Sequence, residues 1–163
     1  MNESMADIAI LGGGMVGMSL AFQIKERFPD ISITLIDKEP EIGRHSSGRN
    51  SGVLHAGIYY PPGTLKAKVC VQGAKRLRAW CKAENLPVLS CGKVIAPQAE
   101  ELDGQLELLL ERGRANGAEV RLIDENEFLK RVPDGHTATG RALWSPNTCV
   151  VKPKVVLQRL EQR

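Results

Sequence analysis

Aromatic residues are scarce in this chain of 163 residues, at 4%, and no run of basic residues is interleaved with them. Nucleic-acid-binding surfaces combine clustered Lys and Arg with stacking aromatics, so the composition gives that class little support. The net charge of +3 is spread along segments of mixed sign. We therefore expect no nucleic-acid partner.

Long apolar runs are also missing, because no run approaches the roughly 20 residues of a membrane span. Residues 1–7 are acidic and lack the basic and apolar regions of a signal peptide. A cytoplasmic chain is the expectation. The four cysteines show no C-x-x-C pair and no histidines at ligand spacing, which predicts neither a metal site nor a redox dithiol. We expect most of them to be small buried residues.

The chain does have a glycine cluster after an apolar run, in the stretch D-I-A-I-L-G-G-G-M-V-G of residues 7–17. Gly12, Gly14 and Gly17 have the G-x-G-x-x-G spacing. In this motif the first glycine permits a tight turn, the second lets backbone approach a pyrophosphate, and the third lets helix and strand pack closely. The pattern predicts a strand, a turn and a helix whose N-terminus binds an anion.

The neighbouring sequence supplies the context that this motif requires. Residues 15–28 have helical spacing, Pro29 and Asp30 end the helix, and residues 31–36 form a β-branched run that ends at Asp37. An acid at this position accepts hydrogen bonds from ribose hydroxyls and repels a 2′-phosphate, so NADP is disfavoured. The alternative is an ordinary βαβ unit with a glycine turn and a surface aspartate.

Residues 38–64 lack regular periodicity and are dense in Gly, Ser, Pro and His. Connections this long are uncommon without a function. Residues 43–57 can donate many hydrogen bonds while letting backbone come close to a ligand. The alternative is a flexible surface loop, but Val53, Leu54 and residues 58–60 are expected to be buried.

The second half predicts mixed helices and strands. We expect helices over residues 65–85, with a stripe of Leu65, Val69, Leu77, Trp80 and Cys81, and over 100–116. A pair of short strands is expected around Cys91 and Gly92. Further strands are predicted at 119–123, 138–144 and 148–151, with a short helix capped by Asp124 and Glu127 and a last helix starting at Pro153.

Only two strands belong clearly to the nucleotide-binding half, and the sequence stops within a helix. A doubly wound domain has several parallel strands. We therefore expect an incomplete fold, in which the later elements begin a second region inserted between early and late parts of the nucleotide domain. Uncovered edges and apolar faces of such a chain favour self-association.

The sequence resembles the N-terminal part of L-2-hydroxyglutarate oxidases and dehydrogenases, flavoproteins of the D-amino-acid oxidase/glycerol-3-phosphate dehydrogenase superfamily. The resemblance is carried by the glycine turn, by L-I-D-K-E at 35–39 and above all by N-S-G-V-L-H-A-G-I-Y-Y at 50–60. G-x-L-K-A at 63–67, C-G-K at 91–93 and A-N-G at 115–117 extend it over essentially the whole chain. Asp37 departs from the glutamate that is usual in the family.

The resemblance implies FAD, a two-domain fold, and oxidation of a 2-hydroxy dicarboxylate to the 2-oxo acid. The fold class is then α/β, a Rossmann-like FAD-binding βαβ start with part of an inserted α+β substrate-domain region. Residues 1–85 would belong to the FAD-binding domain, with a cofactor loop at 38–64, and residues 86–163 to the start of the substrate domain. The candidate cofactor-binding residues are Gly12, Gly14, Met15, Val16, Gly17, Asp37, Lys38, Ser46, Ser47, Arg49, Asn50, Ser51 and Gly52.

His55 is the candidate catalytic base, because the ordinary pKa of histidine suits proton transfer near neutral pH and its segment resembles one beside the flavin ring. The alternative is a hydrogen bond to flavin or backbone. Arg49 and Lys66 are candidates for binding flavin phosphate or substrate carboxylate, with solvated roles as the alternative. An amine-, amino-acid- or glycerol-3-phosphate-oxidising relative and a non-catalytic nucleotide-binding fragment stay open, as do a peripheral membrane association and a respiratory electron acceptor.

Overall fold

The structure is a computed structural model that describes residues 6–163. The chain folds as two units: residues up to Gly52 together with Lys152–Arg163 form unit 1, and Val53–Val151 form unit 2. The chain therefore leaves unit 1 at Gly52 and returns to it with its last helix. This arrangement agrees with the expectation of an inserted region.

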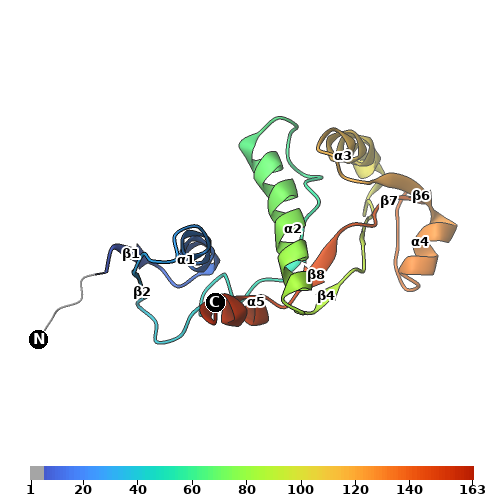
Figure 1. The fold of residues 1–163 in the computed structure, drawn as a ribbon. Coiled ribbons are helices and arrows are strands. Elements are labelled where there is room, and N and C mark those ends of the chain that lie inside the picture. Colours follow the sequence, from blue (N-terminus) through green and yellow to red (C-terminus); the bar gives the residue numbers. More distant parts are fainter. Residues whose placement is uncertain (1–5) are drawn as a thin grey trace, which may run out of the picture. The chain divides into compact units, whose positions relative to one another are not determined.

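Unit 1 is a parallel βαβ element with one added helix (Figure 1). Strand β1 (Ile8–Leu11) pairs in parallel with β2 (Ile33–Ile36), and α1 (Met15–Arg27) connects them. Helix α5 (Pro153–Glu161) packs against α1. The buried side chains of the unit are Ile10, Met18, Val156, Leu157 and Leu160.

Unit 2 contains two three-stranded antiparallel sheets. In one, β8 (Cys149–Val151) lies between β3 (Val53–Leu54) and β4 (Val88–Leu89). In the other, β7 (Arg141–Ser145) lies between β5 (Lys93–Ile95) and β6 (Arg121–Asp124). The helices of the unit are α2 (Leu65–Ala83), the 3-10 turn η1 (Glu100–Leu102), α3 (Asp103–Ala115) and α4 (Glu125–Arg131).

The core of unit 2 lies between α3 and the sheet of β5, β7 and β6. Leu106, Leu109 and Leu110 of α3 pack in one buried cluster with Leu143 of β7 and with Ile58, which precedes α2. Arg141 forms ion pairs from the same sheet to Asp103 and Glu107 of α3, at 2.6 and 3.1 Å. Helix and sheet are therefore joined by apolar packing inside and by charge at the edge.

The structure confirms most of the expected elements, with boundaries that move by one to three residues. Pro153 is the first residue of α5, as expected. Asp124 caps α4 by accepting the Glu127 N–H at 2.8 Å. The Glu127 side chain does not complete the capping box, because it pairs with Arg121 and Arg131.

The expected burial of the α2 stripe is wrong at its N-terminal end. Leu65 is 76% exposed and Val69 60% exposed, whereas Ala67 and Cys81 are buried. The inner face of α2 thus starts at Ala67 and ends at Cys81, with Val71, Leu77 and Trp80 half-buried between them. Tyr59 and Tyr60 were also expected to be buried but are exposed, in contrast to the neighbouring Ile58.

Three other expectations are corrected. The strands on either side of Cys91 and Gly92 exist but do not pair with each other, because β4 pairs with β8 and β5 with β7. The irregular stretch 38–64 contains one short strand, β3. Only Cys81 and Cys149 are buried, while Cys70 is half-buried and Cys91 exposed. The domain boundary expected after residue 85 stays a prediction; the chain passes between the two units after Gly52 and after Val151.

Among residues 6–163, the structure contains neither a helix that could span a membrane nor a cluster of side chains that could bind a metal ion. Across residues 6–163, no helix combines the length and apolar character that crossing a bilayer requires. Within the same residues, no three His, Cys, Asp or Glu side chains gather in a way that would hold a metal ion.

The packing of α3 in unit 2 predicts that a buried leucine of this helix contributes more to the free energy of unfolding than an exposed one. Leu106 is 2% exposed and Leu108, on the same helix, is 38% exposed. Leu106→Ala should lower the free energy of unfolding by about 2–5 kcal/mol, because it leaves a cavity under α3. Leu108→Ala should lower it by about 1 kcal/mol or less. Urea unfolding followed by circular dichroism measures both, and equal losses would contradict this account of the core.

Candidate flavin-binding site

The glycine turn joins the end of β1 to the start of α1. Gly12 has φ +116°, a left-handed backbone that a residue with a side chain rarely adopts, and its N–H donates to the Ile36 carbonyl at 2.7 Å. A Cβ on Gly17 would lie much closer to the Gly12 carbonyl oxygen than van der Waals contact allows. The turn can therefore close only because Gly12 supplies the backbone angle and Gly17 the space.

The first turn of α1 faces the glycine turn with little capping. Gly14 is the N-cap and gives no side-chain hydrogen bond. Ser47 satisfies one N–H group of the first turn, because its Oγ accepts the Met15 N–H at 2.9 Å. Val16 is 84% exposed. A helix start with uncapped N–H groups and glycine backbone is an anion-binding arrangement.

Asp37 binds the glycine turn from the end of β2. Its Oδ2 accepts the Gly13 N–H at 2.5 Å, and its Oδ1 accepts the Glu39 N–H at 2.9 Å. These two backbone donors, in the order Glu39 and Gly13, lower the pKa of Asp37, and the charges of His45 and Lys38 act in the same direction. Asp37 is therefore anionic at neutral pH, and its oxygens retain lone pairs for further donors such as ribose hydroxyls.

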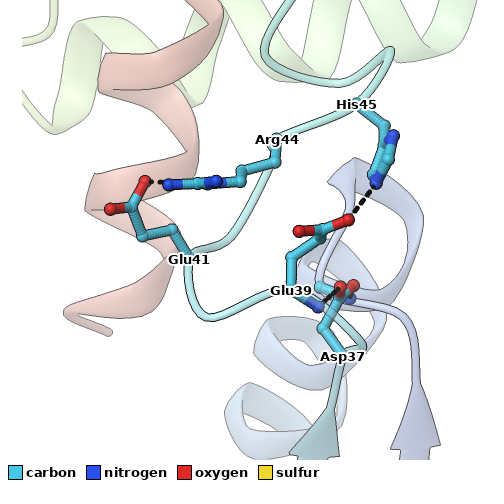
Figure 2. A network of polar contacts seen from close by, with 6 residues as sticks. Asp37, Glu39, Glu41, Arg44 and His45 are labelled. Carbon is cyan, nitrogen blue, oxygen red and sulfur yellow. Dashed lines mark hydrogen bonds and ion pairs between the residues drawn. The ribbon is translucent and has the colours of Figure 1, made fainter.

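A chain of polar contacts continues from Asp37 into the following loop (Figure 2). His45 Nε2 lies 2.9 Å from Glu39 Oε1, and Arg44 donates to Glu41 at 3.2 Å. The carboxyl of Glu41 raises the pKa of Arg44 through this hydrogen bond. All these side chains are at least partly exposed, so each pair adds little stability and serves mainly to order the loop.

Asn50 orders the rest of the cofactor loop within unit 1. Its Nδ2 donates to the carbonyls of Ser46 and Ser47 at 2.9 and 3.0 Å, and its Oδ1 accepts the Gly52 N–H at 2.9 Å. Gly52 has φ +69°. Asn50 thus acts on the loop backbone, and through it positions the Ser47 hydroxyl at the start of α1.

Arg49 lines a cavity of about 520 Å³ in unit 1, together with Arg44 and Lys154. Two carboxylates, Glu41 and Glu161, line the same cavity. Arg49 forms none of the ion pairs found within residues 6–163. Its guanidinium group is therefore available to an anionic ligand in this cavity.

The structure brings part of the predicted cofactor set together in unit 1. Gly12, Gly14, Met15, Gly17, Asp37 and Ser47 are connected through the contacts described above. Lys38, Ser46 and Ser51 lie on the exposed surface of the same unit. The candidate base, His55, belongs to unit 2.

His55 follows β3 and lines a cavity of about 310 Å³. Partial burial, followed by the positive charge of Lys93, lowers the pKa of His55. The lowered pKa favours the neutral imidazole at neutral pH, which is the form that accepts a proton. The backbone carbonyl of His55 accepts a hydrogen bond from the Cys70 thiol at 3.4 Å, so this segment is tied to α2.

Asn116, the last residue of the helix expected over 100–116, holds the segment after His55. Its Nδ2 donates to the carbonyls of Gly57 and Tyr60, both at 2.9 Å. Gly57 has φ +85°, and a Cβ there would lie 2.6 Å from Val71 of α2. No local sequence pattern could reveal these contacts, which cross more than 50 residues.

Comparison with known proteins identifies relatives over nearly the whole chain. The family model "DAO: FAD dependent oxidoreductase" matches residues 7–163. An L-2-hydroxyglutarate dehydrogenase of Indibacter alkaliphilus is 39% identical over 157 residues, which are 96% of this chain and 39% of the relative. The mitochondrial L-2-hydroxyglutarate dehydrogenase of Dictyostelium discoideum is 37% identical over 156 residues, 95% of this chain and 35% of the relative. The chain thus spans less than two fifths of these proteins.

Solved structures share the fold. The FAD-bound, dithionite-reduced L-alpha-glycerophosphate oxidase of Mycoplasma pneumoniae superposes with a TM-score of 0.84 at 26% identity, covering 96% of this chain and 41% of that protein. Glycine oxidase of Geobacillus kaustophilus gives a TM-score of 0.78 at 21% identity, covering 95% and 43%, and supports the fold alone. With the family match over residues 7–163, these findings show that the chain belongs to the DAO family of FAD-dependent oxidoreductases.

Proposed function

We propose that this chain supplies the dinucleotide-binding turn and part of the substrate region of an FAD-dependent enzyme that oxidises L-2-hydroxyglutarate to 2-oxoglutarate. The observation that carries the proposal is the 37–39% identity to L-2-hydroxyglutarate dehydrogenases over almost the full chain. An amine-, amino-acid- or glycerol-3-phosphate-oxidising activity is the second candidate, because the solved relatives include such oxidases.

The residues of unit 1 fit the adenosine and pyrophosphate part of FAD. Gly12, Gly14 and the uncapped start of α1 offer N–H groups and close backbone approach to phosphate oxygens. Asp37 is anionic and lies at the end of β2, where a carboxylate accepts ribose hydroxyls. Lys38, Ser46, Arg49, Ser51 and Gly52 complete the proposed cofactor-binding set, together with Met15, Val16, Gly17, Ser47 and Asn50.

FAD supplies the acceptor for the hydride that leaves the carbon bearing the hydroxyl group. The chain's own part in this chemistry is to bind the cofactor and to hold a proton acceptor. His55 Nδ1 or Nε2 accepts the hydroxyl proton, because its lowered pKa keeps the imidazole neutral. Asn116 and the Cys70 thiol hold the backbone on either side of the His55–Tyr60 segment, and so orient the imidazole.

The first prediction from the proposed function concerns the activity of the 163-residue chain alone. It matches about two fifths of the Indibacter alkaliphilus relative. We expect the 163-residue chain to bind FAD weakly, to oxidise no L-2-hydroxyglutarate, and to associate through the open edge of β1, which pairs only with β2 within residues 6–163. Co-expression with the part of that relative that the chain does not match should restore flavin absorbance near 450 nm and turnover together. We call this assembly the completed enzyme.

The outcome against this prediction is a monomeric chain that purifies with stoichiometric FAD and turns over L-2-hydroxyglutarate unaided. A panel of L-2-hydroxyglutarate, glycerol 3-phosphate, glycine and sarcosine then separates the first candidate function from the second. Preference of the completed enzyme for one of the last three would replace the proposed substrate.

The second prediction tests the flavin site. In the completed enzyme, Asp37→Ala should weaken FAD binding by about 1.5–3 kcal/mol, roughly 10- to 100-fold, as expected for a lost hydrogen bond to a charged group. Asp37→Glu, which restores the usual family residue, should keep most of the affinity. Gly14→Val should weaken binding further, because its branched side chain would occupy the space of the pyrophosphate. Titration of the apoprotein with FAD, followed by flavin fluorescence, measures all three.

The control for Asp37 is Asp30→Ala, which removes an exposed carboxylate from the turn between α1 and β2. Equal affinities of the Asp37→Ala and Asp30→Ala variants would remove Asp37 from the site.

The third prediction concerns His55 and pH. If the neutral imidazole accepts the proton, kcat/KM should fall as pH drops through the pKa of His55, and this acid limb should lie below the usual range for histidine. His55→Gln keeps a hydrogen-bonding side chain but cannot take a proton, so it should lose turnover about as fully as His55→Ala. Steady-state rates between pH 5 and 9 measure this. Wild-type rates and an unchanged profile in both variants would show that His55 is not the base.

A further inference from the structure

Lys93 is a lysine of unit 2 whose charge the fold leaves without a carboxylate partner. It opens β5, where it lies opposite Ser145 of β7. The ion pairs found within residues 6–163 involve other cations, and none includes Lys93. Gly92 precedes it with φ +69°, and a Cβ there would collide with the Trp144 ring. The position of Lys93 is therefore fixed by the sheet and by the glycine before it.

The ammonium group of Lys93 contacts the exposed side chain of Tyr59. Nζ donates to the Tyr59 hydroxyl at 2.6 Å and lies 4.5 Å from the centroid of its ring. Since the phenol oxygen accepts this bond, its own hydrogen is directed elsewhere, and the ammonium keeps two further N–H groups. A cation and a hydroxyl donor side by side form a binding point for an anion.

Lys93 and Tyr59 line a cavity of about 450 Å³. The rest of its wall includes the apolar side chains of Phe128 and Val132. The ammonium group at one end can bind a carboxylate, and the apolar wall beside it can bury the carbon chain of a small carboxylic acid. Small-molecule sites in general combine a few polar groups with an apolar lining.

Tyr59 also connects this cavity to the candidate base. Its ring packs edge to face against the His55 ring, with centroids 6.2 Å apart. His55 lines a different cavity, which neither Lys93 nor Tyr59 lines. Lys93 and His55 nevertheless contact the same aromatic ring, at 4.5 and 6.2 Å from its centroid. A five-carbon dicarboxylate is long enough to reach Lys93 with one end and His55 with the other.

We propose that Lys93 and the Tyr59 hydroxyl bind the substrate carboxylate remote from the carbon that carries the reacting hydroxyl, and thereby select dicarboxylate 2-hydroxy acids. This assignment rests on the proposed function, in which the substrate has two carboxylates. Lys93 is a specificity-determining residue in this scheme, and His55 remains the proton acceptor.

The decisive test compares two substrates in the completed enzyme. L-2-hydroxyvalerate has the carbon chain of L-2-hydroxyglutarate but lacks the remote carboxylate. Lys93→Gln should raise KM for L-2-hydroxyglutarate 10- to 100-fold and leave KM for L-2-hydroxyvalerate within about twofold, because only the first substrate loses a charged hydrogen bond. Lys93→Arg should recover part of the loss, and Tyr59→Phe should show a smaller loss of the same kind.

The matched control is Lys130→Gln, which removes an exposed lysine of α4 in the same unit. It should change neither KM. The flavin absorbance spectrum should be the same in all variants. Equal effects of Lys93→Gln on both substrates, or no effect on either, would overturn the assignment.

A flavin-independent measurement separates this inference from the proposed function. Glutarate, added to the 163-residue chain itself, should shift the His55 and Tyr59 ring signals in NMR saturably, whereas valerate and inorganic phosphate should bind at least tenfold more weakly. Lys93→Gln should abolish the glutarate response. Equal binding of phosphate, or no response in a chain whose spectrum shows it folded, overturns the carboxylate site. Glutarate binding to the 163-residue chain, combined with no turnover of L-2-hydroxyglutarate by the completed enzyme, would instead remove the proposed function and leave the carboxylate site standing.

Discussion

The contact between Gly17 and the Gly12 carbonyl is the constraint on which unit 1 depends. There is no room for a Cβ between them, so any other residue at position 17 would separate α1 from β1. The same turn presents the Gly13 N–H to Asp37, which anchors the end of β2. Strand, helix, second strand and the loop after Asp37 therefore share one short stretch of backbone, and a change there would alter the candidate flavin site before it altered the core.

In unit 2, the backbone of the segment after His55 is positioned mainly by a polar side chain. Asn116 stabilises the backbone of the segment after His55, and Gly57 lets that segment approach α2. The segment carries His55, whose pKa is lowered by partial burial and by the charge of Lys93, and the tyrosine that accepts the Lys93 bond. The candidate base and Tyr59 thus lie on a connection whose geometry is set by a helix end more than 50 residues later. Loops held in this way by a rigid scaffold often carry binding and catalytic residues.

Charge has different roles in the two units. In unit 1, the charges near Asp37 are paired along the loop, so they order backbone and leave the Asp37 carboxylate to backbone donors (Figure 2). In unit 2, Arg141 is paired with α3, while Lys93 has only a hydroxyl partner. Paired charges in these units support the fold, whereas cations outside the ion pairs, such as Arg49 in unit 1 and Lys93 in unit 2, are available to a ligand.

The sequence alone determined the βαβ start, the glycine turn, Asp37 at the strand end, and most helix and strand positions, because these follow from local periodicity, capping and backbone freedom. It also carried the resemblance to flavoproteins through residues 50–60. Tertiary structure decided which strands pair, since β4 and β5 are neighbours in sequence yet belong to different sheets. It likewise decided the inner face of α2, the exposure of Tyr59 and the contacts of Asn116 and Lys93. Those outcomes depend on partners far away in the chain, and a local pattern contains no information about what a surface will meet.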